Sequence, residues 1–202
     1  MQKNKSSRSN QLRIIGGMYR SRKLTFPTIP GLRPTGDRIR ETLFNWLAPH
    51  VFGSRCLDLF AGSGALGIEA LSRGASHVTF IDNSALACES IRNHLNLLDP
   101  ELIPSGKARV VCHNSLLWLA ESRQSESSLF DIIFLDPPFA QNLGETCAGA
   151  LEQSTVLAPD CLIYMEQASH NATDVNLVVP ASWLLVKNKQ AGNVRYQLFN
   201  RK

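Results

Sequence analysis

Apolar and polar positions along the chain alternate between two periods. From Asp37 onward, apolar positions recur at the spacing of a helix, which Pro49 ends. Further along, short apolar runs bounded by glycine, proline or polar residues are typical of strands. These runs predict strands at 56–60, 77–81, 108–112, 130–135 and 161–165. Helical spacing between them predicts helices at 65–73, 84–98, 115–121 and 144–157.

The two ends of the chain have patterns of their own. Residues 12–26 carry two short apolar runs around a Gly-containing turn, which predicts a hairpin, and the proline-rich stretch 27–34 predicts a connector. Residues 183–187 and 194–199 flank a polar turn and predict a closing hairpin.

Strands that alternate with helices form a mostly parallel sheet covered on both faces. We therefore expect a doubly wound α/β sheet of seven strands with an antiparallel edge. The expected organisation is a flexible basic tail (1–10), a hairpin with its connector (11–34) and one main domain (35–202).

Composition narrows the class of protein. The chain has 202 residues, of which 44% are hydrophobic and 19% charged, a profile that fits one globular domain. No apolar run approaches the ~18 residues of a membrane span, and the polar, basic opening MQKNKSSRSN predicts no secretory signal. Five widely spaced cysteines without a CxxC pair predict neither disulfides nor a metal site, and fit a reducing cytoplasm.

Charge is distributed unevenly. Residues 1–40 contain ten Lys or Arg and one acid, a charge of +9, whereas the rest of the chain carries −5. A basic arm on a mildly acidic body is typical of a protein that binds a polyanion, although a solvated tail would have the same composition. The candidates for contact with phosphates are Arg13, Arg20, Arg22, Lys23, Arg33 and Arg40.

A glycine-rich turn follows the first strand of the main domain. Gly62, Gly64 and Gly67 fit G-x-G-x-x-G between a strand and a helix, a pattern that lets the backbone approach a nucleotide. Tight strand–helix turns also use glycine for packing alone. Asp82 ends the next strand, twenty residues past Gly62, where an acid can accept hydrogen bonds from ribose hydroxyls. These residues predict a nucleoside-containing cofactor without separating NAD from S-adenosylmethionine.

Two further polar residues bear on that choice. Asp58 lies inside the strand before the glycines, where a carboxylate repels a pyrophosphate and attracts a sulfonium or ammonium group. It could equally bind loop amides. Asn114 follows the third strand of the main domain and could bind an adenine edge, cap the next helix, or do both.

The sequence Asp136-Pro137-Pro138-Phe139 follows the fourth strand of the main domain. Two prolines fix the backbone and remove two N–H donors. The result is a group of acceptors beside an aromatic ring, which suits a planar ring with an exocyclic amino group. A rigid turn that packs a core Phe is the structural alternative, and the neighbouring nucleoside loop favours the functional interpretation.

Together these motifs resemble a known family. The set LDLFAGSGALGIEAL (57–71), Asp82, Asn114 and DPPF resembles class I S-adenosylmethionine-dependent methyltransferases, which have a Rossmann-like fold, of the type that acts on amino groups. The segments RIIGGMYRSRKL (13–24) and RPTGDRIRETLFNWL (33–47) are similar to the bacterial RsmD family. That resemblance implies methylation of N2 of a guanine in small-subunit ribosomal RNA, within the 30S particle, by a cytoplasmic monomer without metal or membrane.

The resemblance also implies residue roles. The cofactor would be held by Asp58, Phe60, Ala61, Gly62, Gly64, Asp82, Asn83, Asn114 and Ser115. The segment expected to close over it carries Thr35, Asp37, Arg38 and Glu41. The target guanine would be held by Asp136, Pro137, Pro138 and Phe139.

Departures and rivals accompany this interpretation. Ser21 and Asp82 stand where the family commonly has Gly and Glu, and Ala140-Gln141 stands where Arg or Lys is frequent. Related enzymes that methylate adenine N6 or a glutamine amide usually carry Asn-Pro-Pro-Tyr. An NAD-linked oxidoreductase fits the glycines but not DPPF, and a non-catalytic ribosome-assembly factor could keep the whole set.

Overall fold

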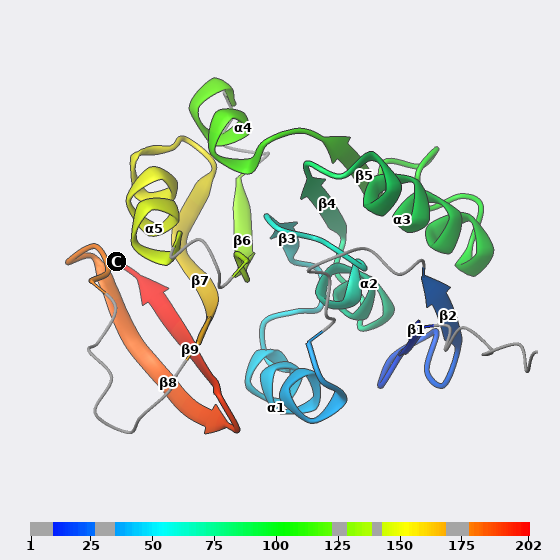
Figure 1. Ribbon diagram of the computed structural model, residues 1–202, viewed down its shortest axis with the longest axis horizontal. Coiled ribbons are helices and arrows are strands. Elements are labelled where there is room, and N and C mark those ends of the chain that lie inside the picture. Colours follow the sequence, from blue (N-terminus) through cyan, green and yellow to red (C-terminus); the bar gives the residue numbers. More distant parts are fainter. Residues whose placement is uncertain (1–9, 27–34, 123–128, 139–142, 169–177) are drawn as a thin grey trace, which may run out of the picture.

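A computed structural model describes residues 10–26, 35–122, 129–138, 143–168 and 178–202 (Figure 1). The predicted tail (1–10) and connector (27–34) therefore lie almost wholly outside the described residues. The strands are β1 (Asn10–Arg13), β2 (Lys23–Phe26), β3 (Arg55–Asp58), β4 (His77–Asp82), β5 (Ala108–Cys112), β6 (Phe130–Leu135), β7 (Leu157–Ala168), β8 (Trp183–Ala191) and β9 (Val194–Arg201). The helices are α1 (Asp37–Leu47), α2 (Ala65–Ser72), α3 (Ala85–Leu98), α4 (Ser115–Glu121) and α5 (Gly144–Gln153).

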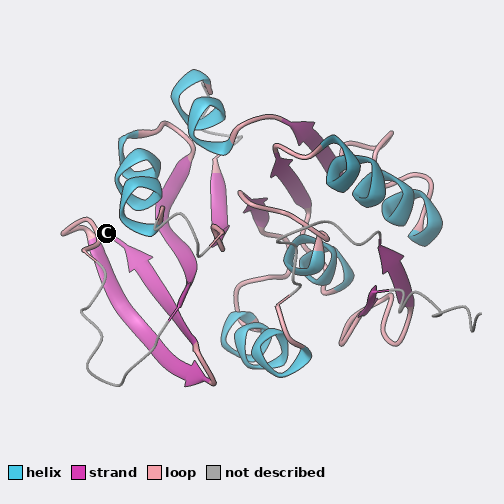
Figure 2. Cartoon of the chain, in the orientation of Figure 1, coloured by secondary structure: helices cyan, strands magenta, loops and turns pink. Residues whose placement is uncertain are grey.

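Seven strands form one sheet in the order β5-β4-β3-β6-β7-β9-β8. The first five of these are parallel, and β9 joins β7 in antiparallel register. The N-terminal strands β1 and β2 form a separate antiparallel pair, so the α/β fold expected from the sequence is confirmed (Figure 2). Among the described helices, none has the length and apolar character needed to cross a membrane.

Side chains of the central strands alternate between two hydrophobic cores. In β6, Ile132 and Phe134 pack into one core, whereas Ile133 and Leu135 pack into the other. The first core contains the apolar faces of α1, α2, α3 and the hairpin, and the second contains those of α4 and α5. A strand buried on both faces reads as a continuous apolar run, which is why β6 is easily found in the sequence.

Element boundaries differ from prediction near α5. The helix ends at Gln153 instead of residue 157, and β7 starts at Leu157 instead of 161. The Val156 carbonyl already accepts a hydrogen bond from the Phe130 amide, so the chain joins the sheet there. The closing hairpin strands β8 and β9 are also longer than predicted, because their extra residues pair along the full ladder.

Glu69 fastens the N-terminal hairpin to the main domain. This α2 side chain is fully buried, and its carboxylate accepts hydrogen bonds from the Ile15 and Gly16 amides, each at 2.8 Å. It also pairs with Arg73 at 2.7 Å and with Arg40 at 3.6 Å. A buried carboxylate is stable only with such partners, so the hairpin is part of the same folding unit as α2.

The prediction that Arg40 contacts phosphates is wrong. Its side chain is 1% exposed and donates hydrogen bonds to the Arg13 carbonyl and to the Asp37 carboxylate. Arg40 lies on the buried face of α1, since Phe44 and Leu47 follow it at helical spacing. Its charge therefore joins α1 to the hairpin.

Candidate functional site

The candidate site lies at the carboxyl ends of β3, β4, β5 and β6 (Figure 1). In the sheet, β3 has β4, the next strand along the chain, on one side and β6 on the other. Ligands of open α/β sheets bind at such a switch in strand order, beyond the carboxyl ends. Most of the residues that the sequence predicted for cofactor and target base lie at this edge, on the strand ends or on the segments that follow them.

The loop after β3 takes the conformation that its glycines allow. Gly62 and Gly64 have φ values of 53° and 77°, in the left-handed region that disfavours side chains. The Gly62 amide donates to the Asp82 carboxylate at 2.8 Å, and the Ala61 amide donates to the Ile81 carbonyl at 2.9 Å. The end of β4 thus holds the loop in place.

Asp82 and Asp58 have different surroundings. One Asp82 oxygen binds the Gly62 amide, and the other accepts from the Ser84 amide at 2.8 Å. Asp58 is 3% exposed and accepts from the Gly67 amide at 3.0 Å. Burial, opposed by the Gly67 hydrogen bond and aided by Asp82, raises the pKa of Asp58 to about 7.

Asn114 and Ser115 connect α4 to this loop. The Asn114 side-chain oxygen caps α4 by accepting from the Leu116 and Leu117 amides at 3.0 and 3.1 Å. Within the described ranges its side-chain nitrogen has no partner, so capping leaves a donor for a ligand. Ser115 is buried and donates to the Leu59 carbonyl, which anchors α4 to the residue that directly follows β3.

A second acidic group lies at the end of β6. Asp136 is partly buried, and its carboxylate accepts a hydrogen bond from the Thr35 hydroxyl at 3.3 Å. Burial, together with the negative charges of Glu166 and Asp58, raises the pKa of Asp136 well above its ordinary value. Pro137 is buried and Pro138 exposed, while Phe139 lies outside the described residues.

Sequence reasoning missed two residues of this acidic group, Glu166 and Tyr164. Glu166 is 4% exposed, and its carboxylate accepts from the Tyr164 hydroxyl at 2.7 Å. Burial raises its pKa, against hydrogen bonds from Tyr164 and Thr35 that lower it. Leu135 pairs with Met165 in register, so Glu166 lies level with Asp136. An acid directly after an apolar strand segment was the available sequence signal.

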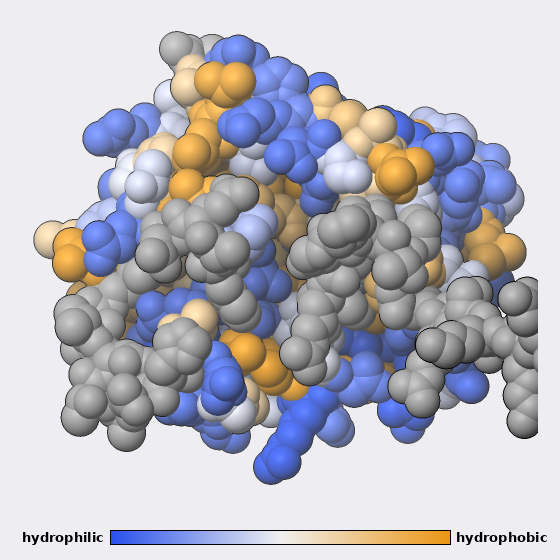
Figure 3. All heavy atoms as spheres, viewed as in Figure 1, coloured by the Kyte–Doolittle hydropathy of each residue, from blue (hydrophilic) through white to orange (hydrophobic). Residues whose placement is uncertain are grey.

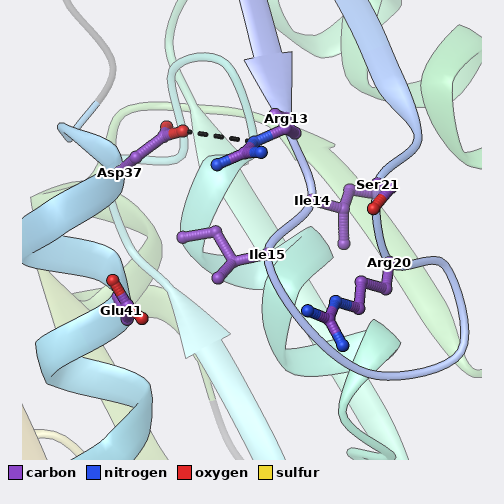
Figure 4. Close-up of a pocket in the computed structure, with 7 residues that line it drawn as sticks. All are labelled: Arg13, Ile14, Ile15, Arg20, Ser21, Asp37 and Glu41. Atoms are coloured by element: carbon purple, nitrogen blue, oxygen red, sulfur yellow. Dashed lines mark ion pairs between the residues drawn. The ribbon is translucent and has the colours of Figure 1, made fainter.

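The segment expected to close over the cofactor is divided in the structure. Thr35 contacts Asp136, but Asp37 and Glu41 lie toward the N-terminal hairpin (Figure 4). Asp37 pairs with Arg13 at 3.6 Å. No interaction among the described residues joins Asp37, Arg38 or Glu41 to the glycine loop, and exposed Asn83 has none with it either.

The remaining basic candidates differ in their surroundings. Arg13, Arg20 and Lys23 are exposed on the hairpin, and hydrophilic residues cover much of the lower edge of this face (Figure 3). The Arg22 guanidinium donates to the Leu97 and Leu98 carbonyls at the end of α3, at 3.0 and 3.4 Å. Arg33 lies outside the described residues.

Metal-binding geometry is absent from the part of the chain that the structure describes. No group of three or more His, Cys, Asp or Glu side chains there could hold an ion. Asp58, Asp136 and Glu166 thus form an acidic region without a metal-ligand arrangement.

Comparison with known proteins gives a consistent picture. Residues 12–200 match the family model described as "Conserved hypothetical protein 95". Ribosomal RNA small subunit methyltransferase D of Escherichia coli is 45% identical over 201 residues, which cover 100% of this chain and 96% of the relative. The protein of the same name from Haemophilus influenzae is 43% identical over 189 residues, 94% of this chain and 93% of that one. The solved structure of the Escherichia coli yhhF protein aligns with a TM-score of 0.81 and 41% identity, covering 96% and 99% of the two chains.

Proposed function

This chain belongs to the Conserved hypothetical protein 95 family, and from that premise we propose that it transfers a methyl group from S-adenosylmethionine to small-subunit ribosomal RNA. The similarity of its motifs to the RsmD family agrees with relatives that align over nearly the whole chain. The observation that carries the proposal is the acceptor-rich end of β6, Asp136-Pro137-Pro138, beside a glycine loop built for a nucleoside.

The acidic groups of the site fit this cofactor. Asp58 and Asp136 have raised pKa values because they are desolvated and face other carboxylates. A ligand with ammonium and sulfonium charges would favour their ionised forms. We propose that Asp58 attracts the amino group, Asp82 the ribose and Asn114 the adenine, with Phe60, Ala61, Gly62, Gly64, Asn83 and Ser115 completing the site.

We propose N2 of a guanine as the methylated atom. Two prolines leave the end of β6 without backbone donors at these positions, so Asp136 and the Pro137 carbonyl would accept hydrogen bonds from the two N–H groups of an exocyclic amine. S-adenosylmethionine supplies the electrophilic methyl group. Asp136 orients the amine lone pair, and its raised pKa makes it an effective acceptor for the proton that is released. Thr35 fixes the carboxylate by its hydrogen bond.

The substrate base must leave its stack to reach this site, which costs a few kcal/mol. The exposed Arg13, Arg20 and Lys23 would neutralise phosphates around it. Substrate affinity should therefore fall steeply as salt concentration rises. A flat salt response would show that the hairpin does not contact RNA phosphates.

The decisive experiment measures transfer of labelled methyl groups to small ribosomal subunits that lack their own modification. Naked small-subunit RNA serves as the second substrate, and mass spectrometry identifies the product nucleoside. N2-methylguanosine on the subunits is expected. Methyladenosine, or methylation of protein, would contradict the proposed atom, and the absence of cofactor binding would contradict the proposed reaction class.

A further inference from the structure

A pocket separates the N-terminal hairpin from α1 (Figure 4). Its volume is about 180 Å³. Sites for complete small ligands span roughly 300–1,000 Å³, so this pocket is sized for one part of a larger molecule. It is lined by Arg13, Ile14, Ile15, Arg20, Ser21, Asp37 and Glu41.

Arg20 and Glu41 line this pocket without forming an ion pair. Within the described residues, neither side chain has a hydrogen bond or an ion pair, and both are exposed. Arg13 and Asp37, in contrast, are paired at 3.6 Å. The pocket thus offers one unoccupied cation and one unoccupied acceptor.

Ile15 provides an apolar wall between them. It is half-buried and points from the hairpin toward α1 (Figure 4). Its amide is held by Glu69, so this wall is fixed. A flat ring could lie against Ile15, with its polar edge toward Glu41 and a charged group toward Arg20.

Position links the pocket to the candidate active site. Asp37 follows Thr35 by two residues, and the Thr35 hydroxyl binds Asp136. A polymer that places one unit at Asp136 could place a nearby unit in the pocket. This argument rests on the proposed function, in which that polymer is ribosomal RNA.

We propose that the pocket between the hairpin and α1 binds an unpaired nucleotide of the substrate RNA near the target base. Arg20 contacts its phosphate, and Glu41 accepts a hydrogen bond from the exocyclic amino group of its base. Bases splayed out of single-stranded RNA are recognised on their edges in this way, and acidic side chains accept from base amines. Uracil, which lacks an exocyclic amine, is disfavoured.

The sign of the Glu41 effect tests the proposal. A carboxylate near RNA that made no contact would repel phosphates, so its removal would strengthen binding. A carboxylate that accepts a base amine has the opposite effect. Glu41→Ala is therefore expected to raise the KM for unmodified small subunits by roughly 5- to 150-fold, with Glu41→Gln between it and the parent protein. The matched control is Glu89→Ala, an exposed acid on α3.

Salt dependence separates the two contacts. Arg20→Ala should raise KM and lower the slope of log KM against log salt by about one unit, whereas Glu41→Ala should leave the slope unchanged. Arg109→Ala, an exposed cation on β5, is the control for lost charge. For all variants, kcat at saturating subunits and S-adenosylmethionine affinity should stay within about twofold of the parent.

Three outcomes would overturn the proposal. They are a KM that matches the controls, tighter subunit binding by Glu41→Ala, and a loss of S-adenosylmethionine affinity with KM unchanged. Each leaves methyl transfer by the parent protein intact. Failure of the proposed function is distinct, because the parent protein itself would then not methylate the subunits.

Discussion

The two halves of the candidate site are built differently. On the side of β3, β4 and β5, polar side chains bind backbone groups within the chain: Asp82 holds Gly62 and Ser84, and Asn114 caps α4. At the end of β6, Asp136 and Glu166 lie close together, and within the described ranges the side-chain donors to them are the Thr35 and Tyr164 hydroxyls. The loops of the first half are held by hydrogen bonds within the chain, whereas the two carboxylates of the second half repel each other.

This difference suits the first half to binding by a fixed shape and the second half to taking part in the reaction. A loop whose backbone groups are hydrogen-bonded within the chain keeps its form without ligand, which suits the binding of a cofactor by geometry. Crowded carboxylates hold protons more tightly than isolated ones, which suits hydrogen bonding to an amine and acceptance of its proton. Variants in the two halves should therefore fail in different assays.

The largest effect is expected from Asp136→Ala. Methyl transfer should fall by about 100- to 10,000-fold, because the variant loses the acceptor that orients the amine and takes its proton. Affinity for S-adenosylmethionine, measured by calorimetry, should remain within a few-fold of the parent protein. An equal loss of binding and turnover would show that the two halves are not separable.

The substitution Asp58→Asn tests a residue of the first half whose charge also acts on Asp136 in the second. Because burial raises the pKa of Asp58 to about 7, its folded state binds a proton more tightly than the unfolded chain between about pH 4 and pH 7. The stability of the parent protein should fall as pH rises through that window. An asparagine carries no such penalty, so the variant should be more stable at pH 8, by at most about 4 kcal/mol, the equivalent of roughly three pKa units.

The measurement for Asp58→Asn is urea denaturation of the ligand-free protein at pH 4.5 and pH 8. The two proteins should converge at the lower pH. Affinity for S-adenosylmethionine should drop in the variant, since the attracting charge is lost. A stability difference that does not change with pH would contradict the assignment.

Gly67→Ala should disturb the half of the site at β3, β4 and β5 through packing alone. An added Cβ would lie 2.2 Å from the Phe80 ring, so a core contact must shift. Overpacking of this kind costs about 1–3 kcal/mol of unfolding free energy, which denaturant titration measures. Gly149→Ala, in α5, has open space around the added Cβ and should instead stabilise by up to about 1 kcal/mol. Equal effects of both would contradict the close approach of α2 to β4.

The smallest effect compares two helix caps. Asn114→Ala and Ser84→Ala each remove a side-chain acceptor from a helix N-terminus and should each cost about 1 kcal/mol in thermal unfolding. Only Asn114→Ala should also weaken S-adenosylmethionine binding, because only Asn114 is proposed to contact adenine. Equal losses of S-adenosylmethionine affinity in both variants would mean that Asn114 acts only as a helix cap.

Elements of strong local pattern could be predicted from the sequence, and partners across the sheet could not. The run at β6 and the turn of Gly62 and Gly64 follow from local rules, since burial on both faces and positive φ restrict the residue types. Glu166 belongs to the site only through the register of β7 against β6. Such register depends on distant residues, which a local pattern does not contain.

Arg40 is the opposite case, in which the local pattern contained the answer and the charge alone gave the wrong prediction. Its charge suggested a phosphate contact, whereas its helical position beside Phe44 and Leu47 already indicated the buried face of α1. Its nearer acid partner, Asp37, precedes it by three residues on the same helix, whereas its second partner, Glu69, lies on α2. A count of charges therefore misled where periodicity would have corrected it.

The hydrogen bonds of Glu69 have a consequence for protein engineering. Residues 10–26 do not form an interchangeable module, because removing them would leave a fully buried carboxylate without the Ile15 and Gly16 amides. A hairpin transplanted from a relative to change RNA selectivity would have to present its backbone amides to Glu69, and a carbonyl to Arg40, at the same positions. New specificity in this scaffold would thus be acquired by replacing exposed hairpin side chains while the backbone at Arg13, Ile15 and Gly16 keeps its course.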